Sequence, residues 1–153
     1  MTAVVAAIRP DSFNFPLFLH VFGAMVLVGA VLTAVVAALT ADRTGDAVRM
    51  RRLTFRTLLI VGLPAYIVMR IGAEWMYSKE FGDLPDDVDD PAWIGVGYIT
   101  ADLGGLLFLI ALACAGVATW KSKSRLGKVA GLIAALALIG WIIAVWAMGA
   151  KPT

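Results

Sequence analysis

The chain has 153 residues, of which 61% are hydrophobic and 16% charged, and its formal net charge is +2. The mean hydropathy is +0.87. Because a water-soluble domain of this length needs a more polar surface, this composition excludes an ordinary soluble globular protein and indicates a single membrane domain. The one cysteine, Cys114, excludes a disulfide within the chain, and we expect it to pack as a small apolar residue.

Four apolar segments are each long enough to cross a bilayer, which takes about 20 helical residues. The first extends from about residue 15 to 40 and the second from about 55 to 77, where Pro64 should kink the helix. The third extends from about 92 to 120 and the fourth from about 129 to 149. The sequence therefore predicts an all-α fold, in which the whole chain forms one bundle of four transmembrane helices.

The loops between these segments predict an orientation. Segment 41–56 carries five arginines and segment 121–128 carries four lysines or arginines, whereas segment 78–93 carries six acidic residues. Basic loops stay on the cytoplasmic side of a membrane. We therefore expect both termini outside, in a bacterial-type inner membrane, with the first segment retained rather than cleaved. The basic loops should contact anionic lipid, and they are too short to predict binding of nucleic acid.

Small residues recur every four positions in several of the helices. The third segment carries Gly97, Ala101 and Gly105, and similar rows occur in the first and fourth segments. Such rows allow helices to approach closely in a membrane. They either close the bundle of one chain or join two copies, and a homo-oligomer is therefore one expected outcome.

Four ionisable side chains lie within the apolar segments, namely His20, Arg70, Glu74 and Asp102. A charge inside hydrocarbon is costly and is a candidate functional group. The helical rise places Asp102 about 15 Å into the third segment, and the other three nearer the acidic loop. All four therefore lie in the half of the bilayer that faces this loop. Charged residues without a common role would be expected in both halves.

The spacing of these residues predicts a network. Arg70 and Glu74 are four apart and share a helix face, while Tyr98 precedes Asp102 by four. Arg70 and Asp102 lie at compatible depth for a pair between helices, and we expect His20 to hydrogen-bond Glu74 or Asp102. Such a network is either a structural lock between helices or a site for a proton, ion or cofactor that opens to the outside.

Three chemistries suit such a site. A histidine ordinarily titrates near neutral pH, and beside carboxylates it has the composition of a proton or cation site. His20 with the thioethers of Met76 and Met148 is a candidate copper(I) site, although methionine is also a common packing residue. A b-type haem with two axial histidines would need a dimer, or histidine–methionine ligation, because the chain has one histidine.

The stretch LFLHVFGAMVLVGAVLTA and the closing WAMGAKP together resemble small four-helix integral membrane proteins related to the copper-resistance CopD-like membrane domain. The matching positions are Leu19, His20, Gly23, Gly29, Met148, Lys151 and Pro152. The resemblance covers the first and last helices, and it implies a four-helix bundle and a role for His20. The larger copper-linked relatives carry more histidine and methionine than this chain.

The function predicted from these observations is binding or translocation of a small cation, proton or metal by a membrane protein. His20, Arg70, Glu74, Tyr98 and Asp102 are the predicted binding residues, and His20, Met76 and Met148 the metal candidates. One alternative is a non-catalytic helical subunit or assembly protein whose polar network is structural. Another is a redox protein that binds haem or quinone. No catalytic residue is predicted, because the sequence lacks a phosphate loop, a CxxC motif and a Ser/His/Asp set.

Overall fold

The computed structural model describes residues 14–81 and 92–149, and every regular element in these ranges is helical. Four helical stretches are long and apolar enough to cross a membrane, which confirms the predicted all-α fold with four spanning helices. The elements are α1 (Asn14–Thr40), α2 (Ala47–Arg56), the π-helical η3 (Thr57–Gly62), α3 (Leu63–Phe81), α4 (Ala92–Trp120) and α5 (Ser124–Gly149).

Two of the helices extend further than the apolar segments from which they were predicted. The second span begins at Ala47 rather than near residue 55, and the fourth begins at Ser124 rather than near 129. The Asp46 side chain caps α2 by accepting a hydrogen bond of 3.0 Å from the Arg49 backbone N–H. Most of the arginine-rich segment, from Ala47 to Arg56, is therefore helix rather than loop.

The second span changes its helical pitch just before a proline. Residues Thr57–Gly62 form a π-helix, in which the Leu63 N–H donates to the carbonyl of Leu58, five residues earlier. The ring of Pro64 lacks an N–H and would clash with a carbonyl four residues before it. A widened turn makes room for the ring, so the local distortion predicted at Pro64 takes the form of a π segment.

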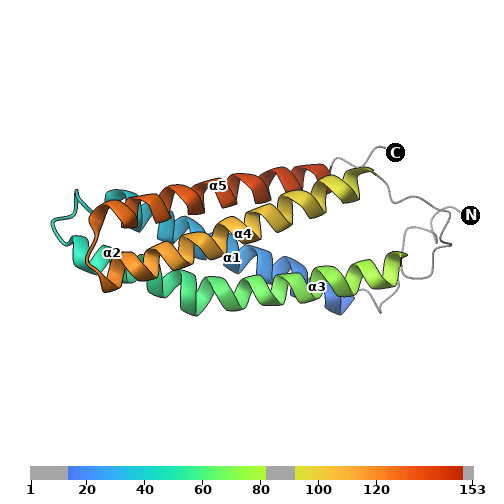
Figure 1. Cartoon of the computed structure of the whole chain (residues 1–153). Helices are drawn as coiled ribbons and strands as arrows, with labels where there is room; N and C mark the ends of the chain where they lie inside the picture. The colour runs from blue at the N-terminus through green and yellow to red at the C-terminus, as the bar shows by residue number, and fades with distance from the viewer. Residues whose placement is uncertain (1–13, 82–91, 150–153) are drawn as a thin grey trace, which may run out of the picture.

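The long helices lie side by side, and Figure 1 shows α2 at the end where α4 passes to α5. We call this the basic end, defined by residues 41–56 and 121–128. Helix α4 packs along α5, α1 packs on α3 and α5, and α2 meets α4 at the basic end. Helices α3 and α4 make few backbone contacts, and they lie apart at their other ends (Figure 1). We call the opposite end of the bundle, where α3 ends and α4 begins, the α3–α4 end.

Glycines let α1 and α3 touch backbone to backbone. A Cβ atom on Gly23 would lie 2.6 Å from the Met69 backbone nitrogen, and one on Gly72 would lie 2.5 Å from that of His20. Both distances are too short for a methyl group, so these two positions require glycine. The contact fixes His20 against α3 near the α3–α4 end.

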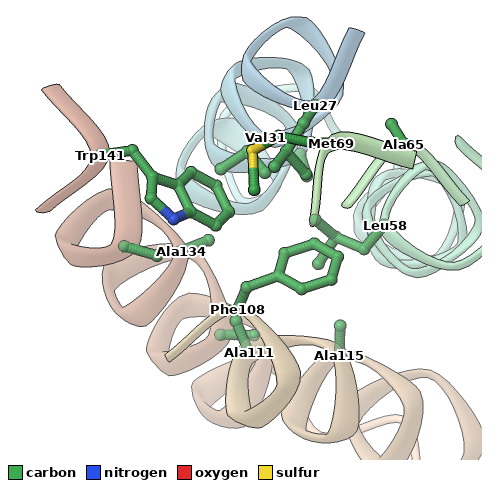
Figure 2. Close-up of a cluster of buried hydrophobic side chains, with 13 residues drawn as sticks. Leu27, Val31, Leu58, Ala65, Met69, Phe108, Ala111, Ala115, Ala134 and Trp141 are labelled. Atoms are coloured by element: carbon green, nitrogen blue, oxygen red, sulfur yellow. The ribbon is translucent and has the colours of Figure 1, made fainter. Parts of the chain in front are cut away.

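The core is built from alanines and a few large side chains. Figure 2 shows the Phe108 ring pointing from α4 toward Leu58, while the Trp141 indole enters from α5. Phe108 and Leu58 are fully buried, and Trp141 is 6% exposed. Trp141 is thus a core residue, although tryptophan in general favours the boundary of a membrane. Tyr66 packs beside it, with ring centroids 6.4 Å apart.

The small-residue rows face partners within the same chain. A Cβ on Gly131 of α5 would lie 2.7 Å from the Ala38 methyl of α1, and one on Gly105 of α4 would overlap the Tyr66 hydroxyl. Gly97 is buried as well. These rows therefore close the bundle of one chain, which is one of the two outcomes that the sequence left open.

Candidate cation site between α3 and α4

A single arginine joins two carboxylates from different helices. The Arg70 Nη2 atom lies 2.9 Å from Glu74 Oε1 one turn further along α3, and Nη1 lies 2.8 Å from Asp102 Oδ1 on α4. Because the backbones of α3 and α4 make few contacts, this side chain spans the space between them. The guanidinium fork suits such a double pairing, since its nitrogens point in fixed directions.

The two carboxylates are far more open than the arginine that holds them. The side chains of Glu74 and Asp102 are 52% and 59% exposed, whereas that of Arg70 is 26% exposed. With both carboxyls ionised, the trio carries one negative charge in excess. In a membrane, exposed charge at this depth needs water, a cation, a proton or a partner protein to compensate it.

Two tyrosines border this trio. The Arg70 guanidinium carbon lies 5.9 Å from the centre of the Tyr98 ring, so the cation also contacts an aromatic face. Tyr98 in turn meets Tyr77 edge to face, with ring centroids 5.4 Å apart. The structure thus brings four of the predicted residues together: Arg70, Glu74, Tyr98 and Asp102.

His20 takes a different partner from the one expected. Its Nδ1 atom lies 3.2 Å from the backbone carbonyl oxygen of Met69, and the hydrogen bonds found in the described residues include none from His20 to Glu74 or Asp102. A carbonyl oxygen can only accept, so Nδ1 carries the proton and Nε2 of the neutral ring carries the lone pair. The contact at Gly72 brings the backbone of His20 close to α3, within reach of the Met69 carbonyl.

The predicted metal ligands are only partly described. Met76 is half-buried on α3, and the side chain of Met148 lies outside the described residues, as do Lys151 and Pro152 and most of the acidic segment. Within ranges 14–81 and 92–149, no three His, Cys, Asp or Glu side chains form a group able to hold a metal. A copper site of His20 with methionines stays a prediction, as does haem ligation.

The sequence did not single out Arg51 and Thr54. Arg51 is 9% exposed and Thr54 is 2% exposed, and both face the interior at the basic end. Thr54 donates a hydrogen bond of 3.0 Å to the Met50 carbonyl. The available signal was the spacing of Arg51, Thr54 and Leu58, which places all three on one helix face once the helix is known to begin at Ala47.

The chain matches no family model, no curated protein and no solved structure. The resemblance to the CopD-like membrane domain therefore stays a prediction.

Proposed function

We propose that this protein binds or translocates a small cation or a proton at the site formed by Arg70, Glu74 and Asp102. The observation that carries the proposal is the pair of contacts from Arg70 to carboxylates on two helices whose backbones make few contacts. The excess negative charge attracts a cation, and both carboxylates are exposed enough for the cation to reach them.

Each residue has a distinct part in this proposal. Asp102 and Glu74 accept the cation or proton, while Arg70 sets the number of negative charges that remain uncompensated. Binding a proton or cation at Asp102 weakens its attraction to Arg70, and this loosens the link between α3 and α4. The site therefore couples occupancy to the separation of two helices. His20, held through Nδ1, leaves Nε2 as a separate polar atom beside α3.

The proposal includes an orientation in the membrane. The basic loops at residues 41–56 and 121–128 lie on the cytoplasmic side of a bacterial-type inner membrane, and the α3–α4 end faces outward with both termini. The site then takes its cation from outside the cell. Fusing a reporter to either terminus and assaying its side of the membrane tests the orientation independently of the site.

Flux through purified protein in liposomes tests the function. Vesicles carrying a pH-sensitive dye are challenged with a proton gradient, and parallel vesicles with a sodium or potassium gradient. We expect wild-type protein to dissipate one of these gradients and Asp102→Asn to lose most of that activity. Asp42→Asn is the matched control, because this carboxylate pairs with Lys128 at the basic end, at 2.6 Å.

Binding without flux is tested in the same preparation. A cation that binds only the folded protein raises its Tm as the cation concentration rises. We expect such a shift for wild-type protein and Asp42→Asn, and none for Asp102→Asn. The proposal is contradicted if two results occur together. Flux in vesicles with the protein equals flux in protein-free vesicles, and every cation and pH change shifts the Tm of wild type and of Asp102→Asn equally.

A structural lock is the second candidate, and the same ion pairs favour it, because Arg70 connects two helices that lack close backbone contact. A lock predicts that the loss of stability in Asp102→Asn shrinks to the same extent with every salt of equal ionic strength, because screening of a partly exposed ion pair does not depend on which cation is present. A cation site predicts that the loss differs between cations at equal ionic strength. The two candidates therefore differ in the conditions under which the variant is weaker.

A further inference from the structure

The basic end contains a buried arginine, Arg51 on α2, that makes no ion pair within residues 14–81 and 92–149. Arg51 is 9% exposed. Its backbone carbonyl accepts a hydrogen bond of 3.1 Å from the Thr119 hydroxyl of α4. The position of Arg51 between the helices is therefore fixed by its own backbone and does not depend on a salt bridge.

The side chain of Arg51 crosses to the start of α5. Its Cγ and Cδ atoms lie 3.4 Å from the place that a Cβ on Gly127 would occupy. Gly127 lies in the first turn of α5, where its N–H donates to the Lys123 carbonyl. The glycine thus leaves room for the arginine to pass close to the N-terminus of the helix.

Among the described residues, no carboxylate and no side-chain acceptor pairs with the Arg51 guanidinium. The ion pair found at this end joins Lys128 to Asp42, at 2.6 Å. Segments 41–56 and 121–128 together contain nine lysines and arginines but only two aspartates. A buried cation without a counter-ion is costly, and basic neighbours raise that cost. An anion at this end offsets the charge of Arg51 and of its basic neighbours.

A small cavity lies beside this arginine. Its volume is about 10 Å³, and it is partly open to the outside. Its lining residues are Ala38, Arg51, Thr54, Ala115, Ala118 and Gly127. About one water molecule fits in such a volume. The lining of the cavity is almost wholly apolar, so a larger anion stays at the mouth among the basic side chains.

The N-terminus of α5 adds to the attraction for an anion. The first N–H groups of a helix have no partner within it, and the helix dipole places partial positive charge there. The first turn of α5 contains no acidic residue that would occupy these donors. Helix N-termini of this kind commonly bind phosphate.

We propose that Arg51 and the first turn of α5 bind a phosphate group at the basic end of the bundle. The guanidinium donates to phosphate oxygens in its fork geometry, and the anion supplies the charge that Arg51 lacks. The phosphate belongs either to the headgroup of an anionic lipid or to a free phosphate ion. Basic pockets between membrane helices suit lipid headgroups in particular.

Lipid titration in neutral detergent tests the site. Purified protein receives phosphatidylglycerol, phosphatidylcholine or inorganic phosphate, and native mass spectrometry counts the bound molecules while Tm is followed. We expect one phosphatidylglycerol per chain to bind in preference to phosphatidylcholine. Arg51→Met keeps an unbranched stem but removes the charge, and it should weaken this binding by about 10- to 100-fold, the value of a charge-assisted hydrogen bond. If inorganic phosphate displaces the lipid, and also raises Tm when no lipid is present, the free phosphate ion is the ligand.

Arg52→Met is the matched control, because Arg52 lies next to Arg51 in the chain and carries the same charge but is exposed. It should change binding by less than about 3-fold, the effect of one surface charge. Arg51→Lys keeps the charge but lacks the fork geometry, so its binding should fall between that of wild type and that of Arg51→Met. Without anionic lipid, Arg51→Met should be at least as stable as wild type, since it loses an uncompensated charge. Equal weakening by Arg51→Met and Arg52→Met, or no preference for phosphate-bearing anions, overturns the proposal.

Discussion

Arg70 of α3 and Asp102 of α4 form an ion pair of 2.8 Å across two helices whose backbones make few contacts. The arginine is mostly covered and the aspartate mostly exposed, at 26% and 59%. The same arginine holds Glu74 on its own helix, at 2.9 Å. One cation therefore serves two acids, and its pair with Asp102 is one of the side-chain contacts that join α3 and α4, beside that of Tyr77 with Tyr98.

Asp102→Asn should lower the stability of the bundle more than Glu74→Gln does. The first variant removes the charge pairing between two helices, whereas the second removes a pairing within one helix. Both pairs are partly exposed, so we expect losses of about 1 kcal/mol or less for either variant. Thermal unfolding in neutral detergent measures the order of the two variants. If Glu74→Gln is less stable than Asp102→Asn, the Arg70–Asp102 pair does not join the helices as described.

Gly23→Ala and Gly72→Ala should each destabilise the contact between α1 and α3. The added methyl group meets backbone atoms, which cannot turn aside as a flexible side chain can. Overpacking of this kind costs about 1–3 kcal/mol. Gly29→Ala on α1 is the control, because a Cβ there meets nothing within 4 Å. It should be neutral or stabilising, since alanine favours helix. Equal effects of all three variants on unfolding would refute the backbone contact.

Trp141→Phe should cost much less than Trp141→Ala. The Nε1 atom of Trp141 is buried and lacks a hydrogen-bond partner among the described residues. Phenylalanine removes this unsatisfied N–H, whose burial costs about 1–3 kcal/mol, and so offsets part of the lost packing. Alanine leaves a cavity, at about 3–5 kcal/mol. Chemical unfolding of the two variants gives the comparison, and similar losses would contradict it.

Gly104→Ala should show coupling to Trp141. A Cβ at Gly104 would lie 2.6 Å from Nε1 of that indole. The substitution should therefore destabilise wild-type protein but cost less in a Trp141→Ala background, where the whole indole is gone. A double-mutant cycle in unfolding free energy measures the difference. Strictly additive effects would show that the glycine and the indole are not in contact.

His20→Asn should preserve the contact with α3 better than His20→Gln. The Asn side-chain nitrogen occupies nearly the position of Nδ1 and can donate to the Met69 carbonyl, whereas Gln places its nitrogen near Nε2. Nitrogen NMR of wild-type protein should also show the proton of the neutral ring on Nδ1. A ring protonated on Nε2, or a Gln variant more stable than the Asn variant, would contradict this hydrogen bond.

Much of the fold follows from hydrophobicity alone. Four apolar segments predict four spanning helices, because a bilayer requires long helices with satisfied backbone hydrogen bonds. The beginning of α2 was harder to predict, since its first two turns are basic and resemble a loop in composition. Only the Asp46 cap, with its hydrogen bond from Arg49, signals that the helix starts earlier.

The grouping of Arg70, Glu74 and Asp102 follows from helical spacing and depth. The placement of His20 does not, because it depends on the close approach of α1 and α3 at Gly23 and Gly72. Likewise, Trp141 resembled a residue of the membrane boundary, since depth along a helix says nothing about the side to which an indole points. Rotation about the helix axis is set by packing, and packing here depends on glycines spread over four helices.

Infrared difference spectroscopy tests the central claim most directly, because it detects protonation and ion binding at single carboxyl groups. Spectra of the purified protein are recorded across a change of pH and across a change of cation. The account predicts a carboxyl signal that disappears in Asp102→Asn and remains in Asp42→Asn. An identical spectrum in wild type and Asp102→Asn, under every cation and pH tested, would contradict a cation or proton site at Arg70, Glu74 and Asp102.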